Sequence, residues 1–211
     1  MSGIKEMKKT VLNNSKGFTL IEIAIVLVII GLIIGAAVKG KDLIQSGKQK
    51  KFYTNVIKAW ELTVVSYYDR TGMLLGDGTV NGGTAAAPNS QFDNIWGNAF
   101  DNANGVDATI QKVGLTLPTS NTAESGQNTY KGSYGAVRTI NMRLEYAGGT
   151  IASNCLRFNT MPVDLAIAID TMVDGQMDPQ AGNFRIVGAA TAWPDASAGG
   201  TANVRYLMDI P

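Results

Sequence analysis

The first hydrophobic pattern in the chain is one uninterrupted apolar run, residues 18–38, which reads FTLIEIAIVLVIIGLIIGAAV. Thr19 and Glu22 are its only clearly polar residues, and both lie near its start, so a helix formed by it would have no polar face along its length. Twenty-one residues in an α-helix extend about 31 Å, close to the hydrocarbon thickness of a bilayer at about 30 Å. The run therefore predicts a transmembrane helix.

An ordinary secretory signal peptide is the alternative for this run. Such a peptide has an apolar region of about 7–15 residues that ends at a small-residue cleavage site, whereas this run is longer and continues directly into Lys39 and Lys41. Lysines are enriched on both sides of the run, in residues 1–17 and in residues 39–51. Because both flanks are positive, charge does not decide the orientation of the helix in the membrane.

The second pattern is amphipathic and follows the lysine-rich stretch. Apolar residues recur every three or four positions, and the stripe consists of Phe52, Val56, Trp60, Val64 and Tyr67, widened by Tyr53, Ile57 and Tyr68. This spacing predicts that the helix continues to about Gly72, with the stripe packed against the rest of the chain. The result would be one helix of about 50 residues.

Beyond this helix the pattern predicts loops and then a small sheet. Residues 76–105 and 116–129 are rich in Gly, Asn and other polar residues, with Trp96 and Phe100 as anchors, and residues 108–113 suggest a short helix capped by Asp107. Alternation predicts strands at 140–146, 150–158, 183–189 and 204–210, and a helix at 162–174 that begins with Pro162 and is ended by Gly175. The predicted fold class is α+β, with about four antiparallel strands packed on the long helix.

Composition excludes several kinds of chemistry. The chain has 211 residues, no histidine, one cysteine and a net charge of +1. Ser-His-Asp and Cys-His catalysis, histidine metal sites and an intramolecular disulfide are therefore excluded. Cys155 lies in a predicted strand and is expected to be a small buried apolar residue. No basic surface stands out that would suggest specific nucleic-acid binding.

Three aspartates form the one candidate cation site. Asp170, Asp174 and Asp178 are four residues apart, so the first two share a helix face and the following loop can bring the third towards them. Calcium takes six to eight oxygen ligands, which makes it the candidate ion. The alternative is that these carboxylates are solvated or cap nearby backbone groups.

The junction Gly17-Phe18-Thr19-Leu20-Ile21-Glu22 resembles the class III leader junction of type IV prepilins and type II secretion pseudopilins. The resemblance covers about the first 70 residues. It implies that a prepilin peptidase in the inner membrane cuts between Gly17 and Phe18 and methylates the new amino terminus at Phe18. Glu22 takes the position of the carboxylate at the fifth mature residue, which pairs with the ammonium of Phe18 on its own chain or on a neighbouring subunit. Such pairing would neutralise two charges that lipid penalises.

The resemblance also implies a pilin-like organisation. The cleaved leader would be 1–17, the transmembrane and filament-core half of the spine helix 18–38, its amphipathic soluble half 39–71, a variable loop region 72–130, and the antiparallel sheet head 131–211. Gly31 and Gly35 are then sites of close helix packing or of local helix flexibility. Pilins often staple their C-terminal region with a disulfide, and some relatives use calcium there, which gives the three aspartates their interest.

The function implied is that of a structural, non-enzymatic subunit of a type IV pilus-like filament. The precursor would be a single-pass inner-membrane protein in contact with lipid, with a periplasmic head. An assembly platform and its separate ATPase would then polymerise it as a homo-oligomer. Its final location would be extracellular. The alternatives are a pseudopilin that forms a periplasmic pseudopilus, a minor or tip pilin with an adhesive or DNA-uptake role, and a membrane-anchored enzyme. No cofactor other than calcium is expected.

Overall fold

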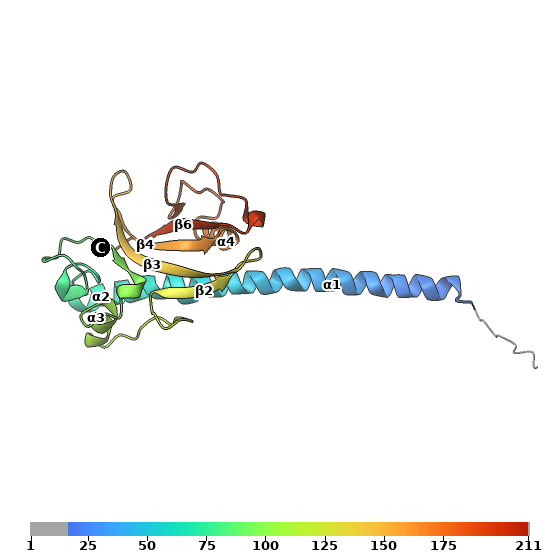
Figure 1. The fold of residues 1–211 in the computed structure, drawn as a ribbon, viewed down its shortest axis with the longest axis horizontal. Coiled ribbons are helices and arrows are strands. Elements are labelled where there is room, and N and C mark those ends of the chain that lie inside the picture. Colours follow the sequence, from blue (N-terminus) through green and yellow to red (C-terminus); the bar gives the residue numbers. More distant parts are fainter. Residues whose placement is uncertain (1–16, 211) are drawn as a thin grey trace, which may run out of the picture. The chain divides into compact units, whose positions relative to one another are not determined.

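The computed structural model describes residues 17–210, so the expectations for leader residues 1–16 lie outside the described residues. The chain divides into two compact units, of which the first ends at Ile44 and the second begins at Gln45. Figure 1 labels helices α1–α4 and strands β2, β3, β4 and β6.

One continuous helical segment of 52 residues runs from Leu20 to Thr71. It consists of α1 (Leu20–Phe52), a π-helical segment (Tyr53–Lys58) and α2 (Ala59–Thr71). Gly72 ends it in the left-handed conformation with φ of 67°, and its N–H donates to the carbonyl oxygen of Tyr68. The predicted length and end of the helix are therefore confirmed. Glycine suits this position because it adopts positive φ without a steric penalty.

The π-helical segment was not predicted from the sequence. In an α-helix a step of four residues overshoots one full turn by about 40°, so the stripe Phe52, Val56, Trp60 and Val64 would drift around the helix. The wider π-helical turn between Tyr53 and Lys58 offsets this drift. As a result, Phe52, Val56, Ile57 and Trp60 are all buried.

The sheet has six strands, and every pairing in it is antiparallel. The strand order is β1-β3-β4-β6-β5, with β2 also paired to β3. The strands are β1 (Ile95–Trp96), β2 (Gln127–Lys131), β3 (Val137–Ala147), β4 (Ser153–Pro162), β5 (Phe184–Ile186) and β6 (Thr201–Leu207). The prediction of about four strands was too low, because β1 and nearly all of β2 lie in residues 72–130, which were expected to form loops. Both pair with β3, and the ring of Tyr130 packs edge-on against Phe52 at 5.6 Å.

The two short helices differ in how well they were predicted. α4 (Val163–Asp174) follows Pro162 and ends at Gly175 with φ of 75°, close to the predicted 162–174. α3 spans Val106–Lys112 rather than 108–113, and its N-cap residue is Gly105. The prediction that Asp107 caps α3 is wrong, because Asp107 lies in the first turn and accepts a hydrogen bond from Ser125.

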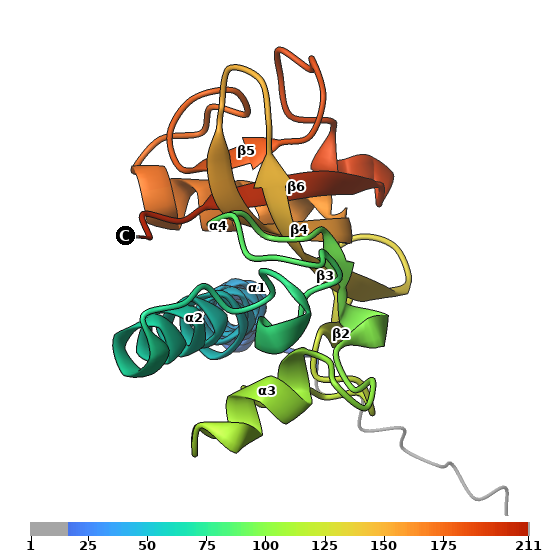
Figure 2. The same cartoon turned by 90° about the vertical axis from the view of Figure 1, so that its left-hand side faces the viewer.

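The core of the second unit lies between the helical residues 52–67 and one face of the sheet. Phe52 packs against Phe158 of β4 at 6.5 Å between ring centroids. Trp60 packs against Phe100 at 5.1 Å, which confirms that Phe100 anchors its loop. Lys58 Nζ donates to Tyr206 Oη of β6 at 2.8 Å. Figure 2 shows α2 on one side of strands β3, β4 and β6. The aromatic stripe is therefore the contact between the helix and its own head.

Candidate functional site

The predicted cleavage junction lies immediately before α1. Gly17, Phe18 and Thr19 are outside any helix or strand, and Phe18 is 83% exposed. No described atom lies within 4 Å of the position that a Cβ on Gly17 would take. A peptidase groove could therefore approach the Gly17–Phe18 bond in an extended backbone, as cleavage requires.

Glu22 caps the start of its own helix. Its Oε2 accepts hydrogen bonds from the backbone N–H and from the hydroxyl of Thr19, both at 2.8 Å. The backbone N–H of Glu22 donates to Thr19 Oγ1 at 3.3 Å in return. This reciprocal pair is a capping box of the form Thr-x-x-Glu, which satisfies helix N–H groups that otherwise have no partner.

The sequence did not lead us to predict that Thr19 forms a capping box with Glu22. The signal was present, because Thr19 stands three residues before Glu22 and directly before the first helical residue, Leu20. Only Oε2 of Glu22 takes part in the capping box, and Oε1 has no hydrogen bond to any described residue. The carboxylate therefore keeps one oxygen available for a second donor.

The apolar helix has no covering of its own within the described residues. Its most apolar 18-residue window has a mean hydropathy of 2.9, and none of that window is buried. Gly31 and Gly35 leave α1 unbroken, and no described atom lies within 4 Å of a Cβ built on either glycine. By length and composition the helix can cross a membrane, and its small-residue positions are open to another helix.

The three candidate calcium ligands act on the backbone of the loop that follows α4. Asp174 accepts the N–H groups of Asn183 and Phe184 at 2.8 and 2.9 Å. Asp178 accepts those of Gln180 and Ala181 at 2.9 and 3.2 Å. Within residues 17–210, no three His, Cys, Asp or Glu side chains are grouped as a metal site. Calcium binding by these residues stays a prediction, and the observed hydrogen bonds correspond to the alternative in which the carboxylates cap backbone groups.

Asp170 is the most buried of the three. Its Oδ2 accepts hydrogen bonds from Trp193 Nε1 at 3.0 Å and from the Asp178 N–H at 2.8 Å, whereas Oδ1 has no partner among the described residues. Burial raises the pKa of the Asp170 carboxyl to about 6, and the two hydrogen bonds oppose this shift. The Phe184 and Trp193 rings stack at 6.4 Å beside it. These contacts tether the loop that follows α4 to the helix.

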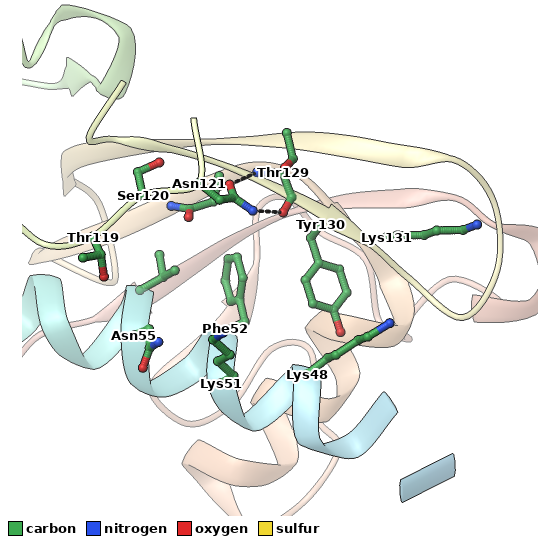
Figure 3. Close-up of a pocket in the computed structure, with 12 residues that line it drawn as sticks. Lys48, Lys51, Phe52, Asn55, Thr119, Ser120, Asn121, Thr129, Tyr130 and Lys131 are labelled. Carbon is green, nitrogen blue, oxygen red and sulfur yellow. Dashed lines mark hydrogen bonds between the residues drawn. The ribbon is translucent and has the colours of Figure 1, made fainter. Parts of the chain in front are cut away.

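A groove of about 450 Å³ lies between the helix and strand β2 in the second unit (Figure 3). Phe52 and Tyr130 contribute its aromatic rings, and the lysines that line it are Lys48, Lys51 and Lys131. Asn121 beside it exchanges hydrogen bonds with the Thr129 backbone at 2.7 and 2.8 Å, which blocks that edge of β2. The lining contains no carboxylate and no thiol. It therefore lacks the usual acid–base pair of a hydrolytic site.

Cys155, the single cysteine, is fully buried, as predicted. Burial raises the pKa of its thiol to about 12, and its Sγ contacts the carbonyl oxygen of Glu145 at 3.2 Å. A thiol in this state is a packing group rather than a nucleophile.

Comparison with known proteins gives one match. Residues 12–38 match the prokaryotic N-terminal methylation motif, the class III signal peptide of type IV pilins and pseudopilins. No curated protein and no solved structure matches the chain. The motif and the apolar helix support a pilin- or pseudopilin-like processed precursor and are consistent with a membrane anchor. The motif implies processing by prepilin peptidase.

Proposed function

We propose that the mature chain is a structural, non-catalytic subunit of a type IV pilus-like filament that polymerises through its apolar helix. The observation that carries the proposal is a membrane-length helix with no buried residue in its apolar window, whose first part lies within a methylation motif. Outside lipid, such a surface needs a covering, and other copies of the same helix provide one. The periplasmic orientation of the head and the extracellular location belong to the same proposal.

In this proposal Glu22 has two separate tasks. Its Oε2 caps the helix through Thr19, and its Oε1 accepts a hydrogen bond from the methylated ammonium of Phe18 on a neighbouring subunit. Cleavage at Gly17 creates that ammonium one residue before Thr19. Pairing the two charges removes the penalty for holding either of them in an apolar filament interior. A subunit without a neighbour leaves the pair incomplete, so the pairing favours assembly in a fixed register.

Two substitutions at Glu22 separate these tasks. Glutamine keeps the capping box but removes the charge, whereas alanine removes both. We expect both Glu22→Gln and Glu22→Ala to be cleaved at Gly17 and to give no filaments. Thr19→Ala, which weakens only the cap, should still assemble. Mass spectrometry of the mature amino terminus, with electron microscopy of sheared surface material, measures both steps.

Normal filaments from Glu22→Gln would refute the charge-pairing role. A mature protein that still begins at Met1 would refute processing, and with it the filament proposal. Filaments on the cell surface would identify a pilus, whereas loss of secretion without surface fibres would identify a pseudopilus.

A further inference from the structure

Four of the six arginines of the chain form a single row across the sheet. Arg143 of β3 is directly opposite Arg157 of β4, Arg157 is opposite Arg205 of β6, and Arg205 is opposite Arg185 of β5. Neighbouring strands lie about 4.8 Å apart, so the row extends about 14 Å. We call these four residues the arginine row.

The arginine row lies on the face of the sheet that points away from the helix. Side chains alternate between the two faces along a strand, and Leu144 and Leu156, which adjoin the row, are fully buried in the core on the helix side. Figure 2 shows α2 on that core side. At the β1 end of the row, the Arg143 guanidinium lies 4.7 Å from the centroid of the Trp96 ring.

Like charges directly opposite one another destabilise a sheet, and this row has three such pairs in succession. One carboxylate offsets them in part. Glu145, whose side chain is 5% exposed, contacts Arg205 Nη2 at 2.6 Å, Arg157 Nη1 at 3.0 Å and Arg143 Nη1 at 3.4 Å. Arg185 has no salt bridge to any described residue. Four positive charges therefore face one negative charge, which leaves an excess of positive charge on this face.

The guanidinium groups also keep unused donors. Arg157 donates from Nε to Asn159 and from Nη1 to Glu145, and Arg205 donates from Nε and Nη2 to Glu145. Arg157 Nη2 and Arg205 Nη1 have no hydrogen bond to a described residue. The side chains of Arg143, Arg157 and Arg205 are each about one-fifth exposed, at 21%, 18% and 20%. An external anion can therefore reach donors that Glu145 already holds in a fixed orientation.

We propose that the arginine row is a binding site for a polymer with regularly spaced carboxylates, namely an acidic polysaccharide chain. A carboxylate is the anion that these guanidinium groups already bind, through Glu145. Residues 45–211 carry twelve basic and fourteen acidic side chains, so binding of an anionic polymer rests on the arginine row rather than on the charge of the unit as a whole. A row of four arginines is short for a nucleic acid, whose binding depends on extended phosphate neutralisation.

Binding at this site does not depend on polymerisation, because the arginine row lies on the sheet face opposite helical residues 52–67. The test uses the full-length chain in non-ionic detergent, so its result is separate from filament formation. Polygalacturonate is the probe, and dextran is the uncharged polysaccharide control. Binding is measured at low and at high ionic strength, because screening should weaken it.

The test variant combines Arg143→Gln with Arg185→Gln. Arg143 has the longest of the three contacts with Glu145, and Arg185 has no contact with it. Arg157 and Arg205 are kept, since removing either would leave the buried Glu145 less well paired. Arg138→Gln is the matched control, because Arg138 is an exposed arginine of the same strand whose side chain lies on the other face. We expect the double variant to bind polygalacturonate about tenfold or more weakly, and Arg138→Gln to stay within about twofold of the wild type.

Several outcomes would overturn the proposal. They are no binding by the wild type, equal affinity of the wild type and the double variant, or an equal loss in Arg138→Gln, which would mean non-specific charge. If a single-stranded oligonucleotide of matched charge binds more tightly than polygalacturonate, the ligand is a phosphate polymer and the proposal of a carboxylate polymer is wrong. If the double variant is unfolded by thermal melting, Arg185→Gln alone must show a reduced affinity, since Arg185 has no salt bridge to lose.

Discussion

At the residue scale, the function of each acidic side chain is set by the donors around it. Glu22 accepts from Thr19 and caps a helix. Glu145 holds three arginines. Asp174 and Asp178 accept backbone N–H groups in the C-terminal loop. The same chemical group therefore serves as a cap, as an ion-pair centre and as a loop tether, and the sequence alone does not distinguish these roles.

Asp170 gives a prediction about pH. Its carboxyl has a pKa of about 6 in the folded chain against an ordinary value of 3.8, so the folded state binds this proton more tightly than the unfolded state does. The resulting stabilisation is complete below the ordinary pKa and is lost as the pH rises through about 6. Relative to Asp170→Asn, the wild type should therefore be more stable at pH 4 than at pH 7.

Thermal melts of both proteins across pH 4–7 measure this difference. Asp195→Asn is the control, because Asp195 is exposed and hydrogen bonds from Ser197 lower the pKa of its carboxyl. The stability of the wild type relative to Asp195→Asn should not fall as the pH rises. A difference between the wild type and Asp170→Asn that is constant with pH would contradict the shifted pKa of Asp170.

At the element scale, the helix is adapted to the sheet by its π-helical segment. Tyr53–Lys58 lies in the part of the helix that packs on the sheet, and both Val56 and Ile57 are buried within it. Lys58 at its end donates to Glu61 at 2.6 Å and to Tyr206 at 2.8 Å, which fixes the segment to β6. The altered turn is therefore a packing device, and it occurs at the helix–sheet contact.

Substitutions on the two sides of this helix should differ strongly. Ile57→Ala creates a cavity at a fully buried position and should lower the free energy of unfolding by about 2–5 kcal/mol. Leu62→Ala, at an exposed position of the same helix, should change it by about 0.5 kcal/mol or less. Urea unfolding of both variants in detergent measures the difference. Equal effects would mean that the helix does not pack on the sheet as described.

At the scale of the whole molecule, the hydrophobic core and the uncovered apolar surface lie in different parts of the described chain. Every residue of the hydrophobic core lies at or after Phe52, whereas the exposed apolar side chains of residues 18–44 have no covering in the described chain. The second unit begins at Gln45 and contains the whole sheet. Removing the first unit should therefore remove the need for lipid or for other copies without removing the core.

A fragment of residues 45–211 tests this separation. We expect it to be soluble without detergent, monomeric by light scattering, and to melt within a few degrees of the full-length chain, because the core and its contacts are retained. The full-length chain should need detergent or assemble. An insoluble fragment, or one that lacks a cooperative transition, would show that the apolar helix contributes to folding of the head.

Much of the local structure could be predicted from residues close together in the sequence. The helix ends at Gly72 and Gly175, and the strand pattern from Ile140 to Tyr146, follow from local backbone preference and from alternation. The start of α3 was mistaken, because Asp107 suits an N-cap position but is engaged by Ser125 from a distant loop. Strands β1 and β2 were missed because they are short, polar in part, and stabilised by pairing with β3.

The sequence by itself determined the apolar helix, the methylation motif at residues 12–38 and the α+β class, because each depends on a local pattern of side chains and on their transfer from water. Only the tertiary structure decided which residues lie opposite one another. Arg143 and Arg205 are 62 positions apart, and only strand pairing through Arg157 brings them into one row. Alternation and turn geometry set the register within a hairpin, but the pairing of distant segments such as β4 with β6 leaves no local signal in the order of the residues.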